Sequence, residues 1–153
     1  MKLKIKTNFS FAKLGRQMPK IVREYITEYA KGTEKGSKSN IDRGLTPSLK
    51  TSTREIRKLR NVSGNKPLKA TGNLYNSIKS NSSQLKFAEY GQYHREGFTP
   101  KKIPTKIKNN KFFLVNNKQG IQVPPREFVG ILDGTRNKIN KDFRIKVKKS
   151  LKK

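Results

Sequence analysis

The chain contains no cysteine and a single histidine, His94. The absence of cysteine excludes disulfides, thiolate nucleophiles and cysteine-based zinc or iron–sulfur sites. One histidine leaves no histidine pair for a metal ion or a proton relay. We therefore expect neither an enzyme nor a cofactor-binding protein, with no catalytic and no metal-binding residues.

Acidic residues are scarce as well. Ten Asp and Glu stand against 37 Lys and Arg, which gives a net charge of +27. Self-repulsion at this charge density opposes compaction, so the imbalance favours a partner that supplies negative charge. That partner is either nucleic acid or an acidic protein surface. The alternative is a basic surface that is merely solvated, and codon bias towards Lys, Asn and Ile explains part of the excess.

Long hydrophobic runs are also missing, and apolar residues make up only 31% of the chain. No stretch approaches the length of a membrane span, and residues 1–6 alternate charged with apolar side chains, unlike a secretory signal. We expect no association with a membrane, and we expect the protein to assemble in the cytoplasm. A chain of 153 residues predicts one domain, residues 1–153, with a modest core and exposed arms that other subunits cover.

Helical periodicity is strongest near the N-terminus. Apolar residues recur at steps of three and four from Phe11 to Tyr29, which predicts a long amphipathic helix. Pro19 predicts a kink or a new helix start, and Gly32 a C-terminal cap. Residues 32–47 are predicted to form a polar loop.

The rest of the chain indicates shorter elements, and helices at both ends around a small antiparallel sheet predict an α+β fold. The predicted elements are a strand over 3–5, an exposed helix over 48–60, a short helix over 72–77 capped by Thr71, strands over 78–82 and 84–89, a helical turn over 90–97, a polar loop over 99–110, a strand over 111–115 that pairs with 121–123, and a helix from Asp133 onward.

The carboxylates do not form an evident site. Glu24 and Glu28 lie four residues apart on the first predicted helix, within reach of Lys20, Lys31 and Lys35. Ion pairs within that helix explain them more simply than metal-ion catalysis does. His94 with Glu96 also falls short of a zinc shell, and we expect its ring nitrogens to bind backbone or a neighbouring subunit.

Two basic stretches, a helix face over 54–60 and a tail over 146–149 and 152–153, are candidates for phosphate contacts that do not read base sequence. A basic face on the second predicted helix and a pair in the 99–110 loop supply the candidate nucleic-acid-binding residues: Arg54, Arg57, Lys58, Arg60, Lys101 and Lys102. The alternative for each is a solvated face. No zinc finger, phosphate-binding glycine loop or RNA-binding sheet signature accompanies them.

Three ordered segments together resemble the phage virion morphogenesis family of neck and tail-completion proteins. The segment 67–78 resembles that family's Leu-x-x-Thr-Gly-x-Leu-x-x-Ser-Ile pattern. Residues 90–97 are similar to the family's segment that contains Tyr and His and ends in Gly. Residues 123–131 are similar to the family's Pro-x-Arg-x-Phe-Leu-Gly segment. An upstream stretch, 45–53, is similar to its Leu, Ser/Thr-Pro and Thr stretch and stands in the same order.

The resemblance implies a structural virion protein of the head–tail neck. Such a protein forms a ring, usually of six subunits, between head connector and tail, around genomic DNA that it contacts without sequence preference. The residues implied in subunit or partner contacts are Leu74, Tyr93, His94, Arg126 and Phe128. The alternative function is a sequence-independent nucleic-acid-binding protein, such as a DNA-packaging or ribosome-associated factor, which explains the charge but not the segments.

Overall fold

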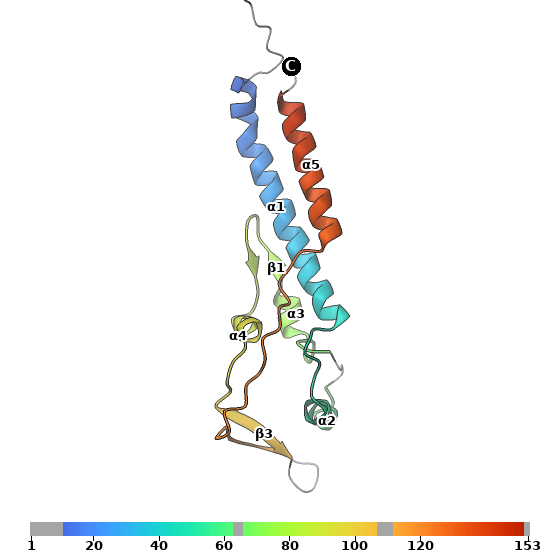
Figure 1. Ribbon diagram of the computed structural model, residues 1–153, viewed down its shortest axis with the longest axis vertical. Helices are drawn as coiled ribbons and strands as arrows, with labels where there is room; N and C mark the ends of the chain where they lie inside the picture. The colour runs from blue at the N-terminus through green and yellow to red at the C-terminus, as the bar shows by residue number, and fades with distance from the viewer. Residues whose placement is uncertain (1–10, 63–65, 107–111, 152–153) are drawn as a thin grey trace, which may run out of the picture.

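The protein has an α+β fold in which a long helical hairpin stands above shorter helices and strands (Figure 1). The computed structural model describes residues 11–62, 66–106 and 112–151. The predicted class is confirmed, with a long N-terminal helix, small antiparallel strand pairs and a C-terminal helix. The elements are α1 (Phe11–Arg43), α2 (Thr51–Leu59), α3 (Asn73–Ser77), β1 (Lys79–Ser80), β2 (Leu85–Lys86), α4 (Tyr90–Glu96), β3 (Lys102–Lys106), β4 (Phe112–Asn116) and α5 (Asp133–Leu151).

Helix α1 continues through both positions where the sequence indicated an interruption. It is one helix of 33 residues that includes Pro19 and extends past Gly32 to Arg43. The predicted cap at Gly32 is therefore wrong, and so is the predicted loop over 32–47 as far as residue 43. Glycine weakens an isolated helix, so a tertiary contact has to compensate for Gly32 and Gly36 here.

That contact is the extended segment 128–131, which lies directly on α1. A methyl group on Gly36 would overlap the carbonyl oxygen of Gly130 and lie 2.9 Å from the Cα of Ile131. Around this point Ser37 Oγ accepts the Gly130 N–H at 3.2 Å, and Asn40 Nδ2 donates to the Phe128 carbonyl at 3.3 Å. Small and polar residues on α1 thus provide the close approach and satisfy the backbone of the segment.

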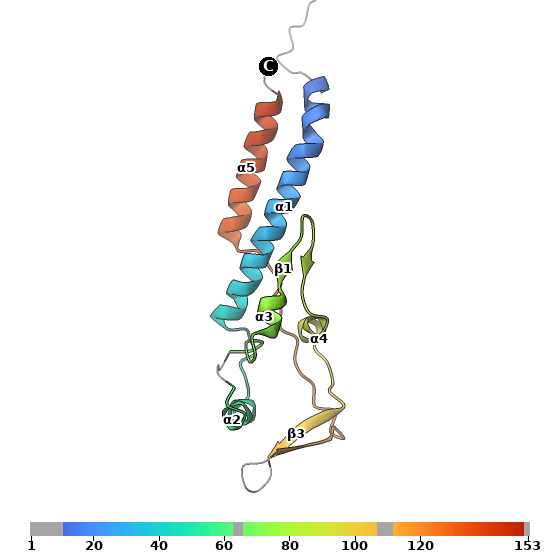
Figure 2. The same ribbon diagram turned by 180° about the vertical axis from the view of Figure 1, so that it is seen from behind.

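Helix α5 packs along the upper part of α1, as Figures 1 and 2 show. The Tyr25 ring lies 4.7 Å from the Phe143 ring, and its hydroxyl donates to Asn140 Oδ1 at 3.0 Å. Lys146 of α5 reaches Glu24 and Glu28, at 3.0 and 3.5 Å. The expectation that lysines of α1 itself pair with these glutamates is therefore wrong, because α5 lies over them.

The strands β1 and β2 form an antiparallel hairpin that lies against α1 (Figure 2). They confirm the strands predicted over 78–82 and 84–89, although the paired part is short. Glu34 of α1 holds the hairpin: its Oε2 accepts hydrogen bonds from the N–H and the hydroxyl of Ser80, each at 2.7 Å, while Oε1 binds Lys38 at 2.8 Å.

A small hydrophobic core lies at the lower end of α1, where segments distant in sequence meet. Its buried members are Ile41, Leu74, Ile78 and Phe128, and the Phe87 ring packs edge-on against Phe128 at 5.4 Å. Leu74 and Ile78, in and directly after the short helix α3, connect this helix to the core. The predicted cap at Thr71 is wrong: the N-cap of α3 is Gly72, with φ of 76°, and no side chain caps the helix, although Thr71 Oγ1 accepts the Asn73 N–H at 3.4 Å.

The last strand pair differs from the prediction. The strand expected over 111–115 is present as β4, but its antiparallel partner is β3, within the predicted 99–110 loop. The expected partner, 121–123, instead contributes Val123 to an isolated bridge with Phe98. Helices α2, α4 and α5 are close to their predicted positions. The strand predicted over 3–5 lies outside the described residues.

Replacing Gly36 by alanine should separate segment 128–131 from α1. The added methyl would overlap backbone atoms rather than a flexible side chain end, and overpacking of this kind costs about 2 kcal/mol. Urea unfolding followed by circular dichroism measures the effect. Gly15→Ala, in the same helix, is the matched control: nothing lies within 4 Å of its new methyl, so it should stabilise by about 0.5–1 kcal/mol. Equal effects of the two substitutions would contradict this packing.

Glu34 should make the protein sensitive to acid. The Lys38 ammonium and the hydrogen bonds from Ser80 hold the pKa of Glu34 at about 2, below its usual 4.5. The carboxylate therefore stabilises the fold fully above pH 4.5, and this contribution is lost as the pH falls from 4.5 towards 2. Glu34→Gln should lower the free energy of unfolding by about 1–2 kcal/mol at neutral pH. Its difference from the wild type should shrink in acid, and a difference that stays constant down to pH 2 would contradict the assignment.

Candidate functional site

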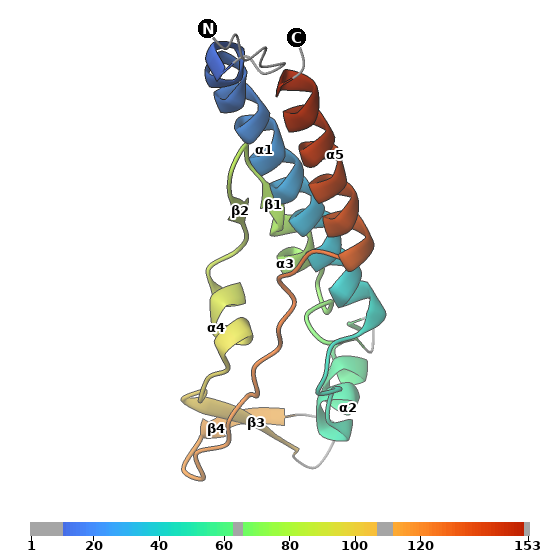
Figure 3. The same cartoon turned by 45° about the horizontal axis from the view of Figure 1, so that its top comes forward.

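The candidate site is a cavity of about 620 Å³ between α2 and α4. Figure 3 shows these two helices on either side of the extended chain that leads to α5, with β3 and β4 below. Residues of both helices and of this chain line the cavity, and Lys102 of β3 also contributes. A volume of this size is typical of sites that bind a small ligand or a few side chains of a partner.

All four segments that carry the family resemblance meet at this cavity. Each contributes lining residues, although about 80 residues of sequence separate the first segment from the last. From the upstream stretch come Pro47, Ser48 and Thr53; from 67–78 come Pro67, Leu68, Ala70, Thr71 and Leu74; from 90–97 come Tyr90 and His94; and from 123–131 come Val123, Pro124 and Arg126.

Hydrogen bonds between backbone and side chains hold the cavity walls together. The Arg126 N–H donates to the His94 carbonyl at 2.8 Å, and its guanidinium Nε donates to the Pro47 carbonyl at 3.3 Å. On the far wall Arg57 Nη1 donates to the Lys66 carbonyl at 2.9 Å. Arg126 is only 8% exposed. It therefore connects three of the four segments and positions a positive charge at the cavity.

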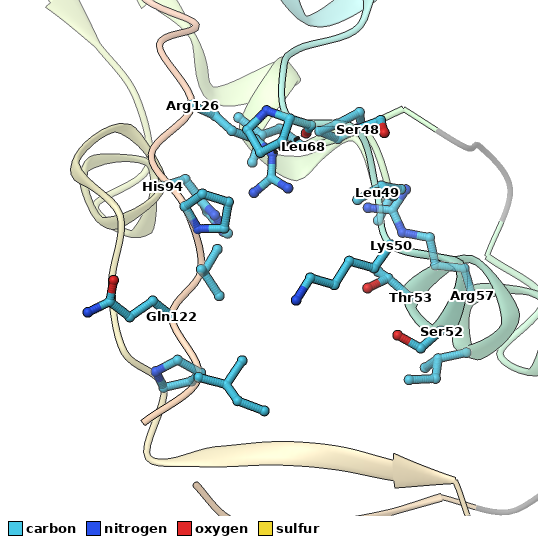
Figure 4. A pocket seen from close by; sticks show the side chains of 18 of the residues that line it. Ser48, Leu49, Lys50, Ser52, Thr53, Arg57, Leu68, His94, Gln122 and Arg126 are labelled. Atoms are coloured by element: carbon cyan, nitrogen blue, oxygen red, sulfur yellow. Dashed lines mark hydrogen bonds between the residues drawn. The ribbon is translucent and has the colours of Figure 1, made fainter. Parts of the chain in front are cut away.

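The cavity is strongly cationic. Lys50, Arg57, Lys102 and Arg126 line it, and no Asp or Glu is among its lining residues. Burial lowers the pKa of Arg126, and the nearby Arg57 guanidinium lowers it further. Figure 4 shows the side chains of Lys50 and Arg126 extending into the same space, with His94 on the wall formed by α4. Like charges in one partly desolvated space favour an anion there.

His94 lies half-buried in this cationic surrounding. Burial lowers the pKa of its imidazole, and the charge of Arg126 adds to the effect. The ring packs edge-on against Phe98 at 5.3 Å. Its Nδ1 is buried and has no hydrogen-bond partner among the described residues, so it does not bind backbone of this chain, and its contact with a neighbouring subunit stays a prediction. A buried nitrogen without a hydrogen-bond partner makes the free energy of the folded state less favourable, and a ligand that forms a hydrogen bond with it removes this cost.

The predicted nucleic-acid-binding residues fall into two groups. Arg57 and Lys102 line the cavity. The other four residues, Arg54, Lys58, Arg60 and Lys101, are exposed outside it. The basic residues of α2 therefore do not share one face. Arg57 lies on the cavity side of the helix, and Arg54 and Lys58 lie outside the cavity.

The predicted subunit-contact residues also divide. Leu74 is 2% exposed and Phe128 is fully buried in the core of this chain, so both pack within the subunit, and their contact with a neighbouring subunit stays a prediction. Hydrophobic residues in a matching segment serve packing at least as readily as recognition. His94 and Arg126 line the cavity, whereas Tyr93 is 62% exposed outside it.

Sequence reasoning missed further cavity residues, among them Lys50 and Ile121. Lys50 lies immediately before α2, and its ammonium points into the cavity (Figure 4). Ile121, predicted in a strand, forms part of the apolar wall. Among 37 basic residues nothing in the linear pattern distinguishes Lys50. Lys50 is distinguished only by its place in the fold, near Thr46 and Pro47 and facing α4.

Over 11–62, 66–106 and 112–151 no group of three or more His, Asp and Glu could hold a metal ion. Among the helices in these ranges, none has the length and apolarity needed to span a membrane. In the comparisons with known proteins, no family model, curated protein or solved structure matches this chain.

The imidazole of His94 should titrate below its usual pKa of 6.5. Because burial and Arg126 oppose protonation in the folded state, the fold should lose stability as the pH falls below 6.5, where the unfolded chain takes up the proton. Proton NMR of the imidazole across pH 4–8 measures this directly, since the chain has only one histidine. His94→Asn, which does not titrate, is the control for the stability measurement. A midpoint at or above 6.5 would contradict the described surroundings.

Proposed function

We propose that this chain is a structural virion protein of the head–tail neck of a tailed bacteriophage, a tail-completion protein. In this proposal it forms a ring, of six subunits, between the head connector and the tail and surrounds the DNA channel. The observation that carries the proposal is the meeting of the four family-like segments at one cavity.

The thin core supports an assembly role. In the described part of the chain seven apolar side chains are buried, and as many large apolar side chains are exposed. Exposed apolar residues of an isolated chain become the buried core of an interface when subunits associate. The exposed ones are Val22, Ile26, Leu59, Tyr90, Tyr93, Ile121 and Ile145.

The elongated shape and the charge suit the same role. The helical hairpin α1–α5 and the β3–β4 pair lie at opposite ends of the molecule (Figure 1), so one subunit can contact several neighbours. In the proposed ring, cations outside the cavity, among them Arg54, Lys58, Arg60 and Lys101, face the DNA phosphates or acidic neck proteins. Such contacts give salt-dependent binding without sequence preference.

The purified chain should therefore form a closed oligomer. Native mass spectrometry should give a mass of about 106 kDa, six times the 17.6 kDa of one chain. Serine in place of Tyr93, the most exposed of the large apolar residues, should shift the population towards smaller species. Thermal unfolding should change little, because the side chain contributes little to the fold of one chain.

The decisive comparison is made in assembling particles. Deletion of the gene should leave filled heads and free tails that do not join. A monomer that binds free DNA with a steep salt dependence, and whose deletion leaves heads and tails joined, would contradict the proposal and favour the sequence-independent nucleic-acid-binding alternative.

A further inference from the structure

The cavity contains positive charges that no carboxylate of the described chain neutralises. Lys50 and Lys102 form no ion pair with a described residue, and Arg126 donates only to a backbone carbonyl. Carboxylates elsewhere are engaged, for example Asp42 with Lys69 and Tyr75. The protein thus holds three cationic side chains around one space, an arrangement that an incoming anion stabilises.

The rest of the cavity wall is apolar. Leu49, Ile56 and Leu68 line the side of α2 and α3, and Ile121, Val123 and Pro124 line the opposite side. A free inorganic anion would leave these surfaces uncovered. A ligand that fills the cavity therefore combines negative charge with apolar groups.

We infer that this cavity binds a segment of a partner protein in which carboxylates alternate with apolar side chains. The carboxylates contact Arg126, Lys50 and Lys102 beside His94, and the apolar side chains cover the wall. The inference rests on the cavity being the partner-binding site of the proposed neck protein. Ring formation and segment binding are separate measurements, so one can fail while the other holds.

A nucleic-acid strand fits this cavity less well than a protein segment does. A DNA backbone presents a dense row of strongly hydrated phosphates and suits an open basic track. Here the cations converge on one space of about 620 Å³ with apolar walls. One or two carboxylates with neighbouring apolar side chains match both its size and its charge.

The test uses the full-length chain and fluorescein-labelled peptides, with binding followed by fluorescence anisotropy at about 150 mM salt. The first peptide is Gly-Leu-Asp-Leu-Glu-Leu-Gly. The second replaces its acids by Asn and Gln, and the third replaces its leucines by glycine. The first should bind about tenfold more tightly than either of the others, because only it satisfies both the charges and the apolar wall.

Two charge-matched double variants locate the binding. Lys50→Gln with Lys102→Gln should weaken binding of the first peptide about tenfold. The control is Lys138→Gln with Lys141→Gln on the exposed face of α5, outside the cavity, which also lowers the net charge of +27 by two. This control should change binding less than about twofold. The peptide should also raise the pKa of His94, seen by NMR, as its carboxylates offset Arg126.

Three results would overturn the inference. The two double variants could weaken binding equally, which would indicate general electrostatic attraction. The neutral or the leucine-free peptide could bind as tightly as the first. A single-stranded DNA of about 12 nucleotides could bind more tightly than the first peptide and lose affinity only in the Lys50 and Lys102 variant, which would make the cavity a nucleic-acid site. A chain that binds the peptide but forms no ring would overturn the proposed function alone.

Discussion

The fold depends on the close approach of segment 128–131 to α1. At Gly36 the two backbones come so near that no side chain fits between them, and Ser37 and Asn40 satisfy the polar groups that this approach buries. Phe128 leads this segment into the core, and α5 follows directly after it. This close contact therefore sets where α5 begins along α1. It also sets the position of the cavity wall that includes Arg126.

The two ends of the molecule use charge differently. Along the helical hairpin, a few cations pair with carboxylates: Lys146 lies between Glu24 and Glu28, and Glu34 binds Lys38 while it holds the β1–β2 hairpin. At the cavity, by contrast, Arg126 is nearly buried near another guanidinium. Glu24, Glu28 and Glu34 thus join elements of the fold, whereas the cavity holds cations to which a partner can supply the opposite charge.

Periodicity and cap residues predicted most of the elements correctly, because local preferences decide them. The short helix after Thr71, the turn at Tyr90–Gly97 and the helix from Asp133 all follow from apolar spacing and turn residues. The wrong predictions share one cause. Gly32 marks a helix end by its local preference, but packing against Ile131 and Ile139 favours continuation. Strand β4 pairs with 102–106 rather than 121–123, a choice between two partners that a linear pattern cannot make.

By itself the sequence determined that the protein is α+β and strongly basic. These properties depend on composition and on residues close together in the chain. Only the tertiary structure decided which cations share a space. It buried Leu74 and Phe128, divided the basic face of α2, and brought Lys50 next to Arg126 and His94 across 76 residues of sequence. The physical reason is that convergence of distant side chains is set by packing of the backbone, here by one close contact between α1 and the chain before α5.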